Sequence, residues 1–371
     1  MLSKNLIKAI QLDDKSFENS KDSFKMPKYD PITHYKCLCD SQYYHALIIL
    51  RHYLKIVSDY YFGNMQKAKN IDLFMFTSSV SSPMGPGSDS EPVPIKFGKL
   101  DTFLVDSSQF GFEPLLMNGL DKVYCYLPSM RGEDCDKRHL NQFYHCELEM
   151  KGGLDKLIPI IEGYTKILAE TFLLMENTIK RISKDSKKSK EYLTNIIEIK
   201  QFPSVTFDDA VELLEKNGLN RYINYTDHGR DISNKGEIAL INILNVKTPI
   251  WLTNFDRDRI PFYQKPDPKN KSKTINADLL FPPIIKGSFG GEIVGSGQRQ
   301  DNDVEMYESL KRQNVSSRPY EWYIDIRRNP KYSKTSGFGL GVERFITWAL
   351  AKDNIRDSIF YPRIKNTITC P

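Results

Sequence analysis

Runs of alternating apolar and polar residues constrain the fold of this chain more than any other feature. LDTFLVDSS (100–108), DKVYCYLPSM (121–130) and YHCELEM (144–150) all alternate in this way. A period of two residues is typical of β-strands that bury one face. Because polar residues connect the runs, we expect an antiparallel meander, with RGEDCDKRHLNQF (131–143) forming a long loop at one of its turns.

Helical spacing marks the segments around these strands. Apolar residues recur at every third or fourth position in 43–62 and in 153–183, which predicts helices with buried faces. More strands and helices follow, so we expect the α+β class, with a mainly antiparallel sheet flanked by helices. The remaining predicted elements are strands at IDLFMFTSSV (71–80), PIWLTNF (249–255), INADLLFPPII (275–285) and GGEIVGSGQRQ (290–300), helices at FDDAVELLEKNG (207–218) and around VEMYESLKRQ (304–313), and a closing strand and helix in SGFGLGVERFITWALAKDN (336–354).

Two segments fall outside this pattern. Residues 1–42 are polar and are interrupted by Pro27 and Pro31, so we expect an irregular N-terminal extension wrapped on a single domain that spans 43–371. SSPMGPGSDSEPVP (81–94) is too rich in serine, proline and glycine for regular structure, and it predicts a loop.

Composition limits the class of protein. With 371 residues, 40% of them hydrophobic and 27% charged, the chain is globular rather than disordered or fibrous. No apolar run is long enough to cross a bilayer and the first residues lack an apolar signal core, so we expect a cytoplasmic protein without membrane contact. Because a chain of this size shows no secretory signal, its six cysteines are expected to be reduced thiols. Cys37 and Cys39 could form half of a zinc site, but no second Cys/His pair has the matching spacing.

Charge alone does not indicate nucleic-acid binding. The net charge of +5 is small, and the basic residues are dispersed along the chain. The lysine-rich segment KRISKDSKKSK (180–190) has two interpretations. It is a solvated helix end or surface loop, or it is a contact with the backbone of a tRNA.

Loop 131–143 combines side chains that suit a phosphate-binding site. Arg131 offers a planar donor fork for a phosphate, Glu133 an acceptor for the amine of a base, and Phe143 a surface for stacking. Taken alone, Arg131 and Glu133 would more often form a surface ion pair, and Phe143 would be a core residue.

Two later segments supply acids, glycines and another cation. Asp278 and Glu292 lie on adjacent predicted strands and suit Mg²⁺, which takes one or two acids plus phosphates, although such acids can equally face solvent. The glycines of GSGQRQ (295–300) let the backbone approach a ligand. GFGLGVER (337–344) is a glycine-rich entry to a helix that can hold an anion, with Arg344 in the first turn, but its glycine spacing alone is nonspecific.

Together these passages resemble a known family. MRGEDCDKRHLNQFYHCELEM (130–150), GGEIVGSGQRQ and SGFGLGVERFITWALAKDNIRDSIFYPR (336–363) are similar to motif 2, the amino-acid-binding strand and motif 3 of the class II aminoacyl-tRNA synthetases of the aspartate/asparagine/lysine subgroup. In detail they most resemble the asparaginyl enzymes. The similarity keeps its order from Tyr43 to Arg363, with further agreement in SDSEP (88–92), DSSQFGFE (106–113), FPSVTFDDAVELL (202–214) and PIWLTNF.

The resemblance implies binding sites for ATP and for an amino acid. The positions that match the family's ATP and Mg²⁺ ligands are Arg131 on the α-phosphate, Glu133 on the adenine amine, His139 on the outer phosphates, Phe143 stacked on adenine, Arg344 on the γ-phosphate, and Asp278 and Glu292 on Mg²⁺. Those that match its amino-acid ligands are Glu91, Gln109 and Glu147 around the α-ammonium group and Arg299 at the side-chain end.

Position 113 separates two branches of the family. The aspartate enzymes carry a lysine just before it, where this chain has Phe112. Glu113 instead resembles the acid of the asparagine enzymes, which accepts from a side-chain amide. The chain also departs from the family pattern, with Gln142 in place of an acid, a longer connection between Asp278 and Glu292, and no clearly placed motif 1 proline.

The family chemistry is the attack of an amino-acid carboxylate on the α-phosphorus of ATP, which gives an acyl-adenylate and pyrophosphate. Only about 40 residues precede the first predicted core helix, too few for the five-stranded anticodon-binding barrel of the full-length ligases. The resemblance to relatives without this barrel favours an AMP-forming ligase that amidates aspartate with ammonia. The alternative is aminoacyl transfer of asparagine or aspartate to tRNA or to another acceptor, and a third hypothesis is a non-catalytic regulator. Motif 1 of the family builds a twofold interface, so a homodimer is expected.

Overall fold

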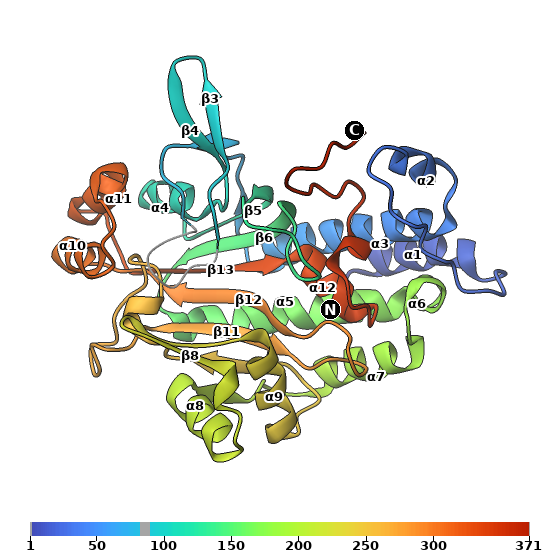
Figure 1. The fold of residues 1–371 in the computed structure, drawn as a ribbon. Coiled ribbons are helices and arrows are strands. Elements are labelled where there is room, and N and C mark those ends of the chain that lie inside the picture. The colour runs from blue at the N-terminus through green and yellow to red at the C-terminus, as the bar shows by residue number, and fades with distance from the viewer. Residues whose placement is uncertain (1, 82–89, 371) are drawn as a thin grey trace.

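An eight-stranded sheet forms the centre of the computed structural model, which describes residues 2–81 and 90–370. Its strand order is β1-β5-β6-β13-β12-β11-β10-β7 (Figure 1). The inner strands pair antiparallel, and the two edge strands pair parallel to their neighbours. The strands of this sheet are β1 (Lys69–Asn70), β5 (Lys122–Met130), β6 (Gln142–Lys151), β7 (Ser204–Thr206), β10 (Ile250–Thr253), β11 (Asn276–Phe281), β12 (Gly291–Gln298) and β13 (Thr335–Gly341).

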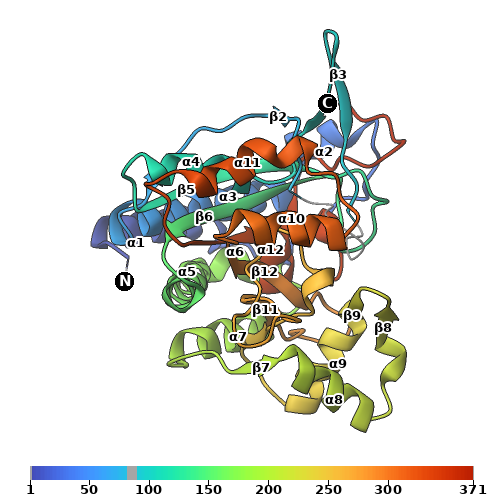
Figure 2. The ribbon, with the colours of Figure 1, turned by 90° about the vertical axis from the view of Figure 1, so that its left-hand side faces the viewer.

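Smaller sheets and helices surround the central sheet. A three-stranded sheet contains β2 (Phe76–Thr77), β3 (Pro94–Phe97) and β4 (Leu100–Leu104), and a hairpin contains β8 (Ile223–Thr226) and β9 (Gly229–Ile232). The helices are α1 (Lys4–Asp14), α2 (His34–Asp40), α3 (Gln42–Asp59), α4 (Gln109–Met117), α5 (Leu154–Leu174), α6 (Glu176–Ile182), α7 (Ser186–Glu198), α8 (Phe207–Lys216), α9 (Asn234–Leu244), α10 (Asp303–Arg312), α11 (Glu321–Asp325) and α12 (Val342–Ala349). In Figure 2 the sheet runs from β5 and β6 near the top to β7 near the bottom, with α4 and α11 at the top and α5 to the left of β11 and β12.

The alternation of β6 divides the molecule into a core side and a site side. Cys146, Leu148 and Met150 join the main hydrophobic core together with residues of α3 and α5. The residues between them, Glu147 and Glu149, point to the opposite face, where they line a cavity. The period of two therefore places the apolar residues in the core and the acids in the site.

Most of the predicted elements are confirmed, including the α+β class with its mainly antiparallel sheet. The helical pattern of 43–62 is α3 followed by one π-helical turn, Tyr60–Met65. The pattern of 153–183 is α5 and α6, with the helix interrupted at Met175. Among the described residues, no helix is both long and apolar enough to cross a membrane.

The predicted meander is wrong in one connection. LDTFLVDSS forms β4, but β4 pairs with β2 and β3 rather than with β5. Helix α4 lies between β4 and β5 in the chain and buries Phe110 and Phe112 against separate small cores, so β4 does not pair with β5 in the central sheet. The strand predicted over 71–80 shrinks to the two residues of β2. Most of the loop predicted at 81–94 lies outside the described residues.

The irregular structure predicted for 1–42 is also wrong in part. Helix α1 begins after Ser3, whose side chain caps the backbone N–H of Leu6. Its Ile10 is buried in the main core. Asp14 at its end accepts hydrogen bonds from the backbone N–H groups of Asn177 and Thr178, which ties the extension to α6. Residues 1–42 are polar overall, and the few apolar contacts that hold α1 give no clear helical pattern in the sequence.

Candidate active site

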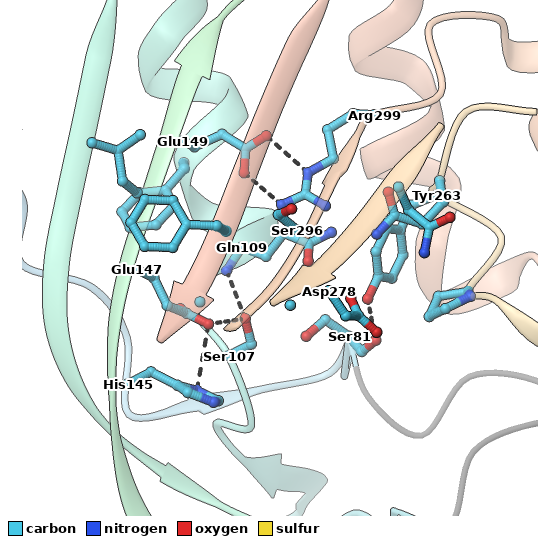
Figure 3. A pocket seen from close by; sticks show the side chains of 18 of the residues that line it. Ser81, Ser107, Gln109, His145, Glu147, Glu149, Tyr263, Asp278, Ser296 and Arg299 are labelled. Atoms are coloured by element: carbon cyan, nitrogen blue, oxygen red, sulfur yellow. Dashed lines mark hydrogen bonds and ion pairs between the residues drawn. The ribbon is translucent and has the colours of Figure 1, made fainter. Parts of the chain in front are cut away.

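A polar cavity of about 260 Å³ opens on the site face of the central sheet (Figure 3). Its walls come from β6, β11, β12 and β13, from the start of α4, and from the segment 260–264. Its polar lining includes Gln109, Arg131, Glu147, Glu149, Tyr263, Gln264, Asp278, Glu292 and Arg299. So many buried polar groups around one space are typical of a ligand site rather than of a core.

Strand β6 supplies a row of side chains to this site. Phe143, His145, Glu147 and Glu149 are two residues apart and so share one face of the strand. The glycines of the neighbouring β13 make room for the acids. A Cβ at Gly337 would lie 1.9 Å from Glu149 Oε2. The glycines of this strand therefore accommodate carboxylates, and they do not only form an anion-binding entry to α12.

Glu147 is fixed by the turn that precedes α4. Its carboxylate accepts from Ser107 Oγ at 2.7 Å and from the backbone N–H of Ser108 at 2.7 Å, and Ser108 Oγ donates to it as well. His145 Nδ1 lies 3.4 Å from the same carboxylate. Burial lowers the pKa of His145 to about 4 against the pull of Glu147, so this imidazole is neutral at physiological pH.

Glu149 and Arg299 form a bidentate pair in the wall of the cavity (Figure 3). Arg299 donates from Nε and Nη2 at 2.8 Å each, and both side chains are almost fully buried. Burial raises the pKa of Glu149 to about 7, with further contributions from the charges of Glu113 and Glu147 and opposition from Arg299. The guanidinium therefore already has a counter-ion within the protein.

Three buried polar atoms along the cavity have no hydrogen-bond partner among the residues that the structure describes. They are Gln109 Nε2, Arg131 Nε and Gln264 Oε1. Gln264 packs against Gly297, where a Cβ would lie 2.0 Å from the amide oxygen. Because unsatisfied buried polar atoms are costly, a polar ligand would relieve all three.

A second cavity of about 100 Å³ continues from the first and shares Arg131, His145, Glu292 and Gly339 with it. The Arg131 guanidinium lies 5.2 Å from the centre of the Phe143 ring. Glu133 and His139 line the same space. This end therefore offers cations and an aromatic ring, which suits a nucleotide.

Arg344 stands in the first turn of α12 and donates to Glu292 Oε2 at 2.9 Å. Burial raises the pKa of Glu292, but the charge and hydrogen bond of Arg344 outweigh this, and the pKa lies below its usual range. Asp278 lines the larger cavity together with Glu292, and burial together with the charges of Glu292 and Glu237 raises its pKa well above the usual value. Among the described residues, no cation forms an ion pair with Asp278 as Arg344 does with Glu292.

Asp278 and Glu292 fit a divalent cation. A Cβ at Gly295 would lie 3.4 Å from Glu292 Oε1 and 3.7 Å from Asp278 Oδ1, so the two carboxylates meet over this glycine. Within the described residues, no cluster of at least three His, Cys, Asp or Glu side chains suits a metal. A pair of acids, with water and phosphate completing the shell, is the arrangement that Mg²⁺ accepts.

The structure brings most of the predicted site residues together. Gln109, Glu147, Asp278 and Arg299 line the larger cavity, Glu133, His139, Phe143 and Arg344 line the smaller one, and Arg131 and Glu292 line both. Two predicted residues lie elsewhere. Glu91 is exposed and pairs with Lys365 Nζ at 3.2 Å, and its backbone N–H donates to Glu133 Oε2. Glu113 is buried against Arg327 and Thr335 and lines neither cavity.

The sequence prediction missed several residues of the site. Glu149 and His145 continue the period of two that runs through Phe143 and Glu147, so the alternation of β6 contained the signal for both. Arg138 lines the smaller cavity with its guanidinium 4.3 Å from the ring centre of Phe289. Tyr263 and Gln264 come from an irregular segment whose sequence carries no pattern.

Comparison with known proteins assigns the chain to a family. The family model of the class II tRNA synthetases (D, K and N) matches residues 80–365. The chain belongs to this family. Curated relatives include the probable cytoplasmic asparagine–tRNA ligase of Encephalitozoon cuniculi, 32% identical over 272 residues, and the asparagine–tRNA ligase of Pyrococcus abyssi, 30% identical over 273 residues. These matches cover 71% and 72% of this chain, and 56% and 58% of the relatives.

Solved structures of class II synthetases share the fold. Asparaginyl-tRNA synthetase from Pyrococcus horikoshii, complexed with asparaginyl-adenylate, matches with a TM-score of 0.78 at 25% identity, over 90% of this chain and 71% of that one. Aspartyl-tRNA synthetase from Entamoeba histolytica matches in fold with a TM-score of 0.71 at 18% identity, over 100% of this chain and 69% of that one. The synthetase chain thus spans little more than half the length of the two curated ligases, at 56% and 58%.

Proposed function

We propose that this synthetase chain activates asparagine with ATP as an acyl-adenylate and then transfers the asparaginyl group to tRNA. The observation that carries the choice of amino acid is the buried Glu149–Arg299 pair. A side-chain amide can donate to Glu149 and accept from Arg299. The carboxylate of aspartate would meet Arg299 beside a competing acid, and its charge would be repelled by Glu149 and Glu147.

In the proposed activation step, a carboxylate oxygen of asparagine attacks the α-phosphorus of ATP. A P–O bond to this oxygen forms, the bond to the bridging oxygen breaks, and pyrophosphate leaves. Arg131 would donate its planar fork to the α-phosphate, where negative charge concentrates, and Arg344 would hold the outer phosphates with His139. Phe143 would stack on adenine and Glu133 would accept from its amine. Gln109 and Glu147 would hold the α-ammonium group.

Asp278 and Glu292 would hold Mg²⁺, which would neutralise phosphate charge when bound. We retain Glu91 as a further ligand of the α-ammonium group, although its side chain pairs with Lys365 in the structure. Glu113 is not proposed as a direct ligand of the amide, because Arg327 and Thr335 occupy its carboxylate. Glu149 takes that role in the proposal.

We propose tRNA as the acceptor of the asparaginyl group because the curated relatives are tRNA ligases. The sequence favoured amidation of aspartate with ammonia, with transfer to tRNA as the alternative. The curated relatives are asparagine–tRNA ligases, which supports the alternative. Glu149 already pairs with Arg299, so the site favours the neutral amide of asparagine over the carboxylate of aspartate. This preference supports the same alternative.

ATP/pyrophosphate exchange tests the proposal, with asparagine and aspartate supplied separately and Mg²⁺ present. We expect exchange with asparagine, and charging of tRNA when tRNA is added. Aspartate-dependent exchange followed by ammonium-dependent formation of asparagine would overturn the proposal in favour of amidation. Absence of exchange with either amino acid would favour a non-catalytic paralogue.

A further inference from the structure

A buried cluster adjoins the Glu149–Arg299 pair without lining either cavity. Its centre is Glu113 on α4, whose carboxylate accepts from Arg327 Nη2 at 2.9 and 3.1 Å. Thr335 Oγ1 donates to the same carboxylate at 2.6 Å. The side chains of Glu113 and Arg327 are 0% and 1% exposed. The cluster is therefore complete within the protein and needs no ligand.

Both partners of Glu113 also hold the backbone around Arg299. The carbonyl oxygen of Thr335 accepts from the backbone N–H of Arg299 at 2.9 Å. Arg327 Nε donates to the carbonyl oxygen of Gln300 at 2.9 Å. Glu113 is thus linked, through one residue on each side, to the backbone N–H of Arg299 and to the carbonyl of the residue that follows.

We propose that Glu113 is a positioning residue for amino-acid selection, which acts by fixing the backbone on both sides of Arg299. This inference rests on the proposed function, in which Arg299 and Glu149 meet the side-chain amide. Arg299 has a long side chain, so a small rotation of its backbone displaces the guanidinium from the geometry that pairs it with Glu149. Misplacement by about 1 Å in a site of this kind can cost about 100-fold in rate.

The environment of Arg327 adds to the rigidity of this link. Its guanidinium lies 4.1 Å from the centre of the Tyr323 ring, and its Nη1 donates to the Tyr323 carbonyl at 2.9 Å. The arginine is thereby held from several sides, and Glu113 supplies its counter-charge. Helix α4 begins at the cavity with Gln109. Through Glu113, this helix contacts Thr335, the first residue of β13.

Variants at Thr335 test the link most cleanly, because they leave both buried charges in place. Thr335→Val removes the hydroxyl at nearly constant volume, and Thr335→Ser retains it. We expect Thr335→Val to raise the Kd for asparagine, measured by calorimetry on the full chain, by about tenfold, since one buried hydrogen bond is lost from a carboxylate. The KM for ATP in pyrophosphate exchange should stay within about twofold of wild type, and Thr335→Ser should restore asparagine binding.

A second variant and a remote control complete the test. Glu113→Gln should weaken asparagine binding by more than Thr335→Val, provided that it folds, because it removes the counter-charge of Arg327. Thr171→Val is the matched control, because Thr171 is a fully buried threonine whose hydroxyl donates to Ile167 O within α5, away from the site. It should leave asparagine binding unchanged.

The outcomes separate this inference from the proposed function. If Thr335→Val binds asparagine as wild type does, or if it weakens ATP and asparagine equally, then Glu113 is only structural and the inference is overturned. If wild type binds asparagine without supporting exchange, the proposed function fails, while the calorimetric comparison still decides the role of Glu113. If wild type binds neither asparagine nor aspartate, both are overturned.

Discussion

The two ends of the site hold their buried charges in different ways. At the end that we propose to bind the amino acid, Arg299 pairs with Glu149, Arg327 pairs with Glu113, and hydroxyl and backbone donors hold Glu147. Toward the end that we propose to bind the nucleotide, Glu292 pairs with Arg344, whereas burial and the charge of Glu292 raise the pKa of Asp278 in the larger cavity. The carboxylates of Glu113, Glu147 and Glu149 thus have partners within the protein, whereas Asp278 has no paired cation among the described residues.

This difference indicates a division of labour. Charges that are paired before the substrate arrives keep a fixed geometry, which favours selection by hydrogen-bond pattern. Charges that await a ligand are destabilising in the free protein and are relieved by binding. Selection between amino acids should therefore be a property of the protein without ligand. Affinity for the nucleotide should instead depend on the phosphates and on the cation that they bring.

The largest effect is expected from Arg131→Ala, because Arg131 lines both cavities. Loss of a cation aimed at the reacting phosphate should lower the rate of pyrophosphate exchange by about 10³-fold. Arg131→Lys keeps the charge but loses the planar fork, so it should recover only part of the rate. Exchange near the wild-type rate in Arg131→Ala would remove this residue from the activation step.

Glu149→Gln should come next, because it removes the counter-ion of Arg299. We expect kcat/KM for asparagine in the exchange reaction to fall by about 100-fold, and the preference for asparagine over aspartate to shrink, since Arg299 becomes free to hold a carboxylate. Glu162→Gln is the control, because Glu162 is a buried acid that accepts from Trp251 Nε1 at 3.0 Å outside the site. An unchanged preference in Glu149→Gln would contradict the selection by this pair.

Asp278→Asn should stabilise the free protein while it impairs exchange. The substitution removes a buried acid that faces Glu292, so the free energy of unfolding without nucleotide should rise by about 1 to 2 kcal/mol. Asp14→Asn is the matched control and should be destabilising, because Asp14 accepts from three donors of Asn177 and Thr178. Chemical denaturation of both variants decides the matter. A less stable Asp278→Asn protein would mean that the nucleotide end is also neutralised internally.

The preference between substrates should depend on pH. The pKa of Glu149 is raised to about 7, above its ordinary value, so this acid is ionised above that pH and protonated below it. Protonation would free Arg299 to receive aspartate. The ratio of asparagine to aspartate exchange should therefore fall by about threefold to tenfold between pH 8 and pH 6. A constant ratio over this range would show that the pair does not titrate.

The smallest effect is expected from Glu91→Gln on stability. Glu91 is exposed and its ion pair with Lys365 spans 3.2 Å at the surface. The free energy of unfolding should change by less than about 0.5 kcal/mol. If Glu91 reaches the α-ammonium group in the reaction, the KM for asparagine will rise while stability stays constant. An unchanged KM would remove Glu91 from the proposed site.

Periodicity in the sequence was sufficient for the regular parts of this account. The alternation in 144–150 and the helical spacing in 153–183 predict β6, α5 and α6 because each pattern records which face is buried. The family motifs placed Arg131, Glu292 and Arg344 around one space. The homodimer expected from motif 1 stays a prediction.

Other features depend on contacts between distant segments, which no local pattern records. Glu113 was predicted as a ligand, but its environment is set by Arg327 and Thr335, more than two hundred residues along the chain. Tyr263 and Gln264 enter the cavity from an irregular segment for the same reason. Helix α1 was missed because its apolar contacts are few, and the shift of β4 to another sheet depends on where α4 packs.

Direct binding of asparagine and aspartate to the wild-type chain, measured by calorimetry without ATP or Mg²⁺, is the decisive measurement of selection by the Glu149–Arg299 pair. If the Glu149–Arg299 pair is formed before the substrate arrives, asparagine should bind without nucleotide. Its Kd should be about tenfold or more below that of aspartate at pH 8. Equal binding of the two amino acids, or tighter binding of aspartate, would contradict the claim that the Glu149–Arg299 pair selects the substrate.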